Sequence, residues 1–119
     1  MKNNIKISNI IKPYLKTLDI EGDKSLSIRW VLLASQALGK SRSFNLLNSE
    51  DVINSLNCLK RLGVKIKISK KFCEIYGNGL NGFRYKKNII LNAGNSGTLG
   101  RLLMGLLTHS EYKIKIKGD

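Results

Sequence analysis

The sequence has 119 residues, of which 42% are hydrophobic, and a formal net charge of +13. This length is one domain at most, and the hydrophobic content is enough for a core, which argues against disorder. No apolar run approaches the ~20 residues of a membrane span, and residues 1–6 lack the apolar core of a signal peptide. We therefore expect a soluble, cytoplasmic protein with no membrane partner.

The positive charge raises the possibility of nucleic-acid binding. The lysines are scattered over the chain, however, and together with many Asn and Ile residues they indicate an AT-biased genome. Aromatic residues are few, and none interleaves along the chain with a basic run, as a stacking platform for bases requires. We expect no nucleic-acid partner, and nucleic-acid binding is kept as an alternative function.

The first half of the chain shows a regular order of elements. In chain order we predict a strand over residues 15–20, a helix over 24–38, a strand over 41–46, a helix from 48 to 62, and strands over 64–68 and 72–76. Gly39 and Gly63 are expected to end the two helices. Strict alternation over 64–68 predicts a strand with one wet face, paired with the strand that follows it.

The turn at Gly22 delivers cations onto the start of the first predicted helix. Lys24 and Arg29 lie in its first turns, and helix N-termini favour anions through free N–H groups and the helix dipole. This predicts a site for a ligand that carries carboxylate or phosphate. The alternative is a solvated lysine with Ser25 or Ser27 as a plain N-cap.

A second turn has the same design. A buried strand is predicted over residues 88–91, a small-residue loop over 92–98 and an apolar helix over 99–107, with Arg101 in its first turn. Gly97 would let a ligand approach the backbone closely, and neighbouring N–H groups would form an anion-binding nest. The alternative is an ordinary strand-to-helix turn capped by Ser96 or Thr98.

A last alternating strand is predicted over residues 113–117. The elements then read as strand, helix, strand, helix, strand, strand, followed by the start of the same series, which is an α/β unit with internal repetition. We expect the chain to be cut short within the second copy.

The cysteines and the single histidine do not suggest a metal site. Cys58 is expected on an amphipathic helix and Cys73 in a strand, without CxxC spacing, which indicates reduced thiols. His109 follows an apolar helix and is most simply a cation at its C-terminal end. We expect neither a metal nor a cofactor.

Four segments carry a resemblance to a known family. They are Gly22–Arg29 (GDKSLSIR), Asn45–Asp51 (NLLNSED), Cys73–Gly79 (CEIYGNG) and Asn95–Arg101 (NSGTLGR). Their order and spacing resemble the N-terminal part of 5-enolpyruvylshikimate-3-phosphate synthases, and the resemblance covers nearly all of residues 15–119. The sister family that acts on UDP-N-acetylglucosamine usually has a Lys-Asn pair in the first loop, so Lys24-Ser25 fits the shikimate branch better.

The resemblance implies a fold and a reaction. The fold is an inside-out α/β barrel of βαβαββ units, of which this chain would supply one unit and part of a second. Residues 1–20 would form an initial segment near the hinge to a second domain, and residues 21–119 a partial N-terminal domain. The implied enzyme is a 3-phosphoshikimate 1-carboxyvinyltransferase, a cofactor-free monomer when complete. It transfers the enolpyruvyl group of phosphoenolpyruvate to the 5-hydroxyl of shikimate 3-phosphate and releases phosphate.

The resemblance also implies roles for individual residues. Lys24 would touch both substrates, Ser25 and Arg29 would hold shikimate 3-phosphate, and Gly97 would offer its N–H to phosphoenolpyruvate. Asn95, Thr98 and Arg101 would hold the second loop in shape without touching substrate. The family's proposed acids and bases all lie beyond residue 119. We therefore expect no catalytic residue here and an inactive isolated chain.

Three alternatives remain open at this point. The chain is similar enough to the UDP-N-acetylglucosamine branch for that enzyme to be a second candidate. A non-catalytic module that retains the anion-binding loops is a third, and a basic nucleic-acid-binding module is a fourth.

Overall fold

The computed structural model describes residues 6, 8, 12–13 and 15–119. Its elements are α1 (Lys24–Gln36), β1 (Leu38–Phe44), α2 (Glu50–Arg61), β2 (Lys65–Ile68), β3 (Phe72–Asn78), β4 (Ile90–Asn92), α3 (Gly97–Leu106) and β5 (Lys115–Lys117). This mixture of helices and strands confirms the predicted α/β class. The start of the predicted initial segment falls partly outside the described residues.

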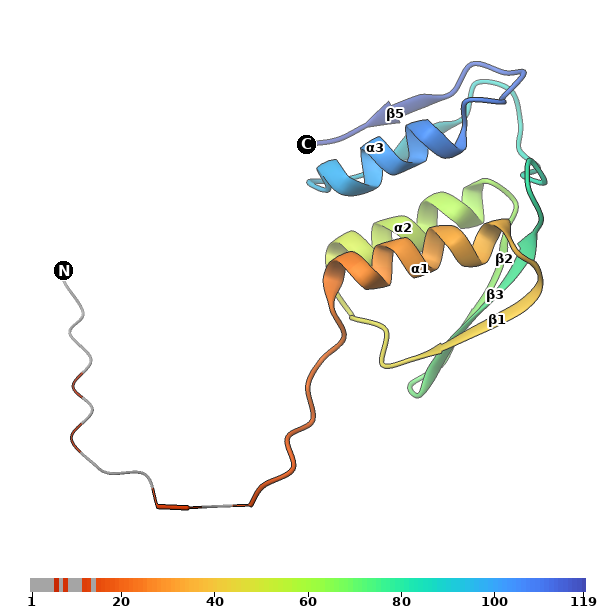
Figure 1. Cartoon of the computed structure of the whole chain (residues 1–119). Helices are drawn as coiled ribbons and strands as arrows, with labels where there is room; N and C mark the ends of the chain where they lie inside the picture. The colour runs from red at the N-terminus through yellow and green to blue at the C-terminus, as the bar shows by residue number, and fades with distance from the viewer. Residues whose placement is uncertain (1–5, 7, 9–11, 14) are drawn as a thin grey trace.

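The helices lie between two small sheets. Figure 1 shows α1 and α2 on one face of a three-stranded sheet of order β1-β3-β2, with α3 above these helices and the pair β4-β5 beyond α3. Apolar side chains from all three helices and from both sheets form one buried cluster. Its fully buried members include Ile28, Val31, Leu59, Ile75, Leu91, Leu99 and Leu103.

The β2–β3 hairpin confirms the prediction from alternating residues. β3 is the central strand and pairs antiparallel with both β1 and β2. It continues past the predicted end at Tyr76, so Gly77 lies in the strand rather than in the turn. A Cβ on Gly77 would overlap the carbonyl oxygens of Ala34 and Ala37, so glycine here lets the end of α1 pack closely on β3.

The predicted bounds of the first helix, and of the strand that follows it, were partly wrong. α1 ends at Gln36 instead of Leu38, and β1 begins at Leu38 instead of Ser41. Gly39, expected to end the helix, lies inside β1 opposite Gly77. It has a φ of +90°, which favours glycine and lets the chain pass from helix to strand with almost no loop.

The strand predicted over residues 15–20 is not formed. These residues are extended but have no strand partner within the described part of the chain, and Leu15, Leu18 and Ile20 are exposed. A segment that contains apolar residues becomes a strand only where a sheet edge is available to pair with it.

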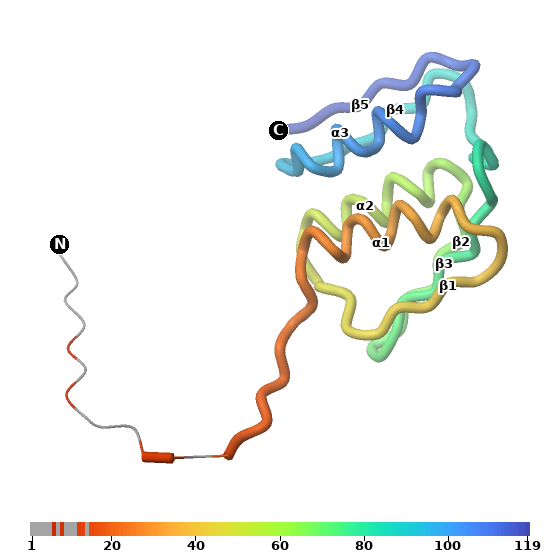
Figure 2. The backbone as a smooth tube through the Cα atoms, in the orientation of Figure 1, coloured from red at the N-terminus to blue at the C-terminus, as the bar shows by residue number. Residues whose placement is uncertain are grey.

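The second half forms a parallel β–α–β unit. β4 pairs in parallel with β5, and α3 provides the crossover between them. Figure 2 shows β5 running beside β4 and ending next to the start of α3. There Ala93 N–H donates to the carbonyl of Lys117 at 2.8 Å, and Asp119 N–H donates to that of Gly94 at 3.2 Å.

Candidate anion-binding site

The start of α1 is fixed by Asp23. The Asp23 carboxylate is the N-cap and accepts a hydrogen bond from Leu26 N–H at 2.7 Å. The predicted caps Ser25 and Ser27 were therefore wrong. Ser27 is instead buried, and its hydroxyl accepts from Leu47 N–H at 3.2 Å, which joins α1 to the loop before α2.

Gly22 is required by the close approach of that loop. A Cβ on Gly22 would overlap the carbonyl oxygen of Asn45. Asn45 has a φ of +57°, and its side-chain amide donates to the carbonyl of Ile20 at 2.9 Å. The turn before α1 and the loop before α2 therefore form one packed unit.

Lys24 is the first residue of α1 and lies against the start of α2. Its Nζ is 3.2 Å from Oδ2 of Asp51, and the two side chains are 58% and 20% exposed. A cation at a helix N-terminus is electrostatically unfavourable, and the Asp51 carboxylate offsets that cost. The Lys24 ammonium is thus held in place while most of it stays open to solvent.

Arg29 lies on another side of α1. Its guanidinium donates to the carbonyl of Ser25 at 3.1 Å, and both residues are exposed. Five residues along an α-helix correspond to a rotation of about 140° between Lys24 and Arg29. The structure therefore groups Ser25 with Arg29 and Lys24 with Asp51.

The start of α3 is open to an anion. Ser96 is the N-cap, and its hydroxyl accepts a hydrogen bond from Leu99 N–H at 3.3 Å. Ser96 and Thr98 were the two candidate caps predicted from the sequence. The N–H groups of Gly97 and Thr98, the first two residues of α3, have no partner within the helix. The first turn holds no acidic residue. Gly97 is exposed, so its N–H is accessible to a ligand.

Arg101 folds back onto this first turn. Its Nη2 would be 3.4 Å from a Cβ built on Gly97, so the guanidinium lies against the glycine backbone. A larger residue at Gly97 would crowd the guanidinium. The pair places a positive charge beside the free N–H groups.

The loop between β4 and α3 is shaped by its own side chains. Asn92 accepts from Gly94 N–H at 3.1 Å, and Gly94 has a φ of +54° and packs against Asn54 of α2. Asn95 is exposed at the tip. A hollow of about 400 Å³ lies between this loop and the residues after β5.

The three helices begin on the same side of the molecule. Figure 1 shows the starts of α1, α2 and α3 at its left, which brings the two predicted anion-binding turns to one surface. Only α2 carries acids in its first turn, Glu50 and Asp51. Acids in a first turn suit the helix dipole, and the contact of Asp51 with Lys24 was not predicted from the sequence. A lysine at a helix start with an acid in a neighbouring motif was the available signal.

Other titratable groups lie away from this surface. A hydrogen bond from Arg42, helped by Lys40, lowers the pKa of Glu74. Burial raises the pKa of the Cys58 and Cys73 thiols, and both cysteines are free. Within the described residues there is no cluster of three or more His, Cys, Asp or Glu side chains suited to a metal ion. No helix among them has the length and apolar character needed to cross a membrane.

Comparison with known proteins identifies the family. The family profile described as EPSP synthase (3-phosphoshikimate 1-carboxyvinyltransferase) matches residues 8–119. The chain belongs to the EPSP synthase family. It is 38% identical over 114 residues to the 3-phosphoshikimate 1-carboxyvinyltransferase of Syntrophomonas wolfei, and 39% identical over 103 residues to that of Streptococcus mutans.

The match extends to solved structures but covers only part of each relative. The EPSP synthase of Acinetobacter baumannii superposes with a TM-score of 0.79 at 32% identity, over 86% of this chain and 23% of that chain. The Syntrophomonas and Streptococcus matches cover 96% and 87% of this chain, and 26% and 24% of the relatives. The chain thus spans about a quarter of the length of these EPSP synthases.

Proposed function

We propose that this chain supplies a substrate-binding part of a 3-phosphoshikimate 1-carboxyvinyltransferase. Such an enzyme moves the enolpyruvyl group of phosphoenolpyruvate to the 5-hydroxyl of shikimate 3-phosphate and releases phosphate. The reaction requires no metal or redox cofactor from this segment, and a cytoplasmic location suits its small-molecule substrates. The names of the relatives favour this reaction over that of the UDP-N-acetylglucosamine branch.

The charge arrangement at the helix starts carries the proposal. Lys24 occupies the first position of α1, and the Arg101 guanidinium lies over the first turn of α3. Cations at these places oppose the helix dipoles, and although Asp51 offsets this cost for Lys24, Arg101 has no ion-pair partner among the described residues. Their presence at two turns on one surface is explained by anionic substrates, which both phosphoenolpyruvate and shikimate 3-phosphate are.

Each group then has a defined task. The N–H of Gly97, supported by Arg101, would bind an oxygen of phosphoenolpyruvate. Ser25 and Arg29, which lie together on α1, would hold shikimate 3-phosphate. The Lys24 ammonium would lie between the two anions and neutralise charge on both as the reaction proceeds. These contacts fix the geometry of two polyanions, whereas proton transfer is left to groups outside this chain.

A chimera tests this assignment. Residues 15–119 would replace the aligned segment of the Syntrophomonas wolfei enzyme, and phosphate release would be measured with both substrates and with either one omitted. We expect release that needs both substrates, within about tenfold of the parent enzyme. A folded chimera that binds phosphoenolpyruvate without releasing phosphate would favour the non-catalytic anion-binding alternative.

A further inference from the structure

Charged and aromatic side chains form regular rows on the face of the three-stranded sheet that points away from the helices. Residues paired across neighbouring strands share a face of the sheet. On this face the pairs form three rows, Lys40–Tyr76–Lys65, Arg42–Glu74–Lys67 and Phe44–Phe72. We call this surface the basic sheet face. The alternate residues of β3, Cys73 and Ile75, are buried under the helices.

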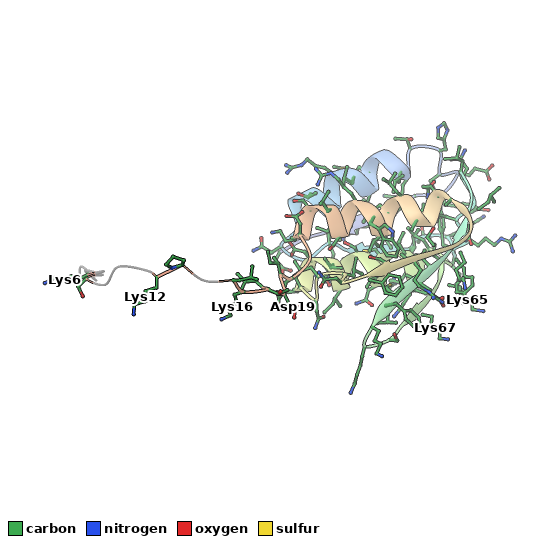
Figure 3. The ribbon with its side chains drawn as sticks, turned by 60° about the horizontal axis from the view of Figure 1, so that its bottom comes forward. Lys6, Lys12, Lys16, Asp19, Lys65 and Lys67 are labelled. Carbon is green, nitrogen blue, oxygen red and sulfur yellow. The ribbon has the colours of Figure 1, made fainter. Side chains whose placement is uncertain are left out.

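The basic sheet face carries more cations than its single carboxylate pairs with. Glu74 is its one acid and is 3% exposed, with Arg42 Nε at 2.9 Å and Lys40 Nζ at 3.4 Å. Lys65 and Lys67 have no carboxylate partner among the described residues. Figure 3 shows these two lysines on the sheet, away from the helices. The face thus holds four cations against one carboxylate, which Arg42 and Lys40 already bind.

Aromatic rings lie between these cations. Phe44 is 66% exposed at the end of β1. The Arg42 guanidinium lies 4.6 Å from the centroid of the Phe72 ring, and Lys65 Nζ lies 5.0 Å from that of Tyr76. These contacts hold the cations above the sheet and leave Phe44 as an open ring next to them. Tyr76 separates Lys40 from Lys65, and Phe44 pairs with Phe72, so these groups come together only across strands and the platform is not visible along the sequence.

We propose that the basic sheet face binds single-stranded nucleic acid. Lys40, Arg42, Lys65 and Lys67 would contact phosphates, and bases would stack on Phe44 at the end of the platform. Cations that follow a backbone, combined with an exposed ring that accepts any base, are the pattern of sequence-tolerant single-strand binding. An acidic peptide would use the cations but would gain little from Phe44. This activity is separate from the helix starts, which lie on another side of the molecule.

Fluorescence anisotropy with labelled oligo-dT and oligo-U of about 12 nucleotides tests this proposal, since that length lies within typical single-strand site sizes. Four phosphate contacts predict that affinity falls about 50-fold between ~50 and ~200 mM salt. Replacing both lysines (Lys65→Gln with Lys67→Gln) leaves two contacts and should reduce this fall to about sevenfold. Phe44→Leu should weaken binding on the order of tenfold at each salt concentration and leave the salt dependence unchanged.

The matched control removes the same charge from the other sheet. Lys113→Gln with Lys115→Gln alters exposed residues at and before β5 and should bind like the unsubstituted protein. Circular dichroism checks that every variant keeps its helices and strands. Three results would each overturn the proposal: no binding at ~50 mM salt, an equal loss in the control, or equal displacement by polyglutamate with no effect of Phe44→Leu. The last result would indicate an acidic protein partner instead.

Discussion

Replacing Lys24 by Met in the chimera is the sharpest test of the anion site. The substitution keeps most of the length of the side chain and removes its charge. Lys24 contacts Asp51 at 3.2 Å with 58% of its side chain exposed, so the ion pair contributes at most about 1 kcal/mol to folding. We therefore expect the melting temperature to change by less than ~4 °C.

The expected effect on activity is much larger. A charge-assisted contact that strengthens in the transition state contributes about 3–4 kcal/mol, so kcat/KM for phosphoenolpyruvate should fall by roughly 10² to 10³. Loss of the ammonium also leaves the Asp51 carboxylate unpaired beside the anions. Phosphate release under steady-state conditions measures the change. Lys86→Met, in the exposed connection before β4, is the control and should alter kcat/KM by less than about twofold.

Asp51 provides the second half of this test. If it acts by holding Lys24, Asp51→Asn should reduce activity in the chimera but have little further effect once Lys24 is Met, or even recover part of the loss. Equal small losses for Lys24→Met and Lys86→Met would refute the anion-site assignment. Independent, additive losses at Lys24 and Asp51 would refute the positioning role of the carboxylate.

Three further predictions concern the 119-residue protein itself. With both substrates it should release no phosphate above the blank, because no acid–base group is assigned to it; clear turnover would contradict this. Gly77→Ala should destabilise it by about 1–3 kcal/mol in urea unfolding because the Cβ meets two backbone carbonyls, whereas Gly105→Ala, which meets nothing within 4 Å, should stabilise it by about 0.5 kcal/mol. Glu74 has a pKa below its ordinary value of 4.5, so its stabilising effect is complete above that pH and is lost as pH falls through the lowered pKa. The difference in urea midpoint between the protein and Glu74→Gln should therefore shrink from pH ~7 to pH ~3, and a constant difference would contradict the pairing with Arg42.

Patterns within one element were predictable from the sequence. Alternation identified the β2–β3 hairpin, and helical spacing of apolar residues identified α2 and its end before Gly63. Boundaries that depend on other elements were not predictable. Gly39 has the conformation expected after a helix, but its place inside β1 is decided by pairing with Gly77.

The candidate site shows the same difference between features within one element and contacts between elements. The glycine turns and their cations are local, so the sequence alone could propose Lys24, Gly97 and Arg101 as site residues. Asp51 was missed because its contact with Lys24 joins residues from two helices. The basic sheet face was missed for the same reason, since its rows combine three strands. In both cases the contacts depend on how helices or strands from different parts of the chain pack together.

The contact between Gly22 and Asn45 also limits how the chain before α1 can move. The Asn45 amide holds the Ile20 carbonyl, and the Gly22 backbone packs on the same loop, so the chain cannot rotate freely at the glycine. A pivot for the extended segment that carries Lys16 and Asp19 (Figure 3) must therefore lie before Ile20. The end of this segment is thus tied to the loop that leads into α2, the helix whose Asp51 pairs with Lys24.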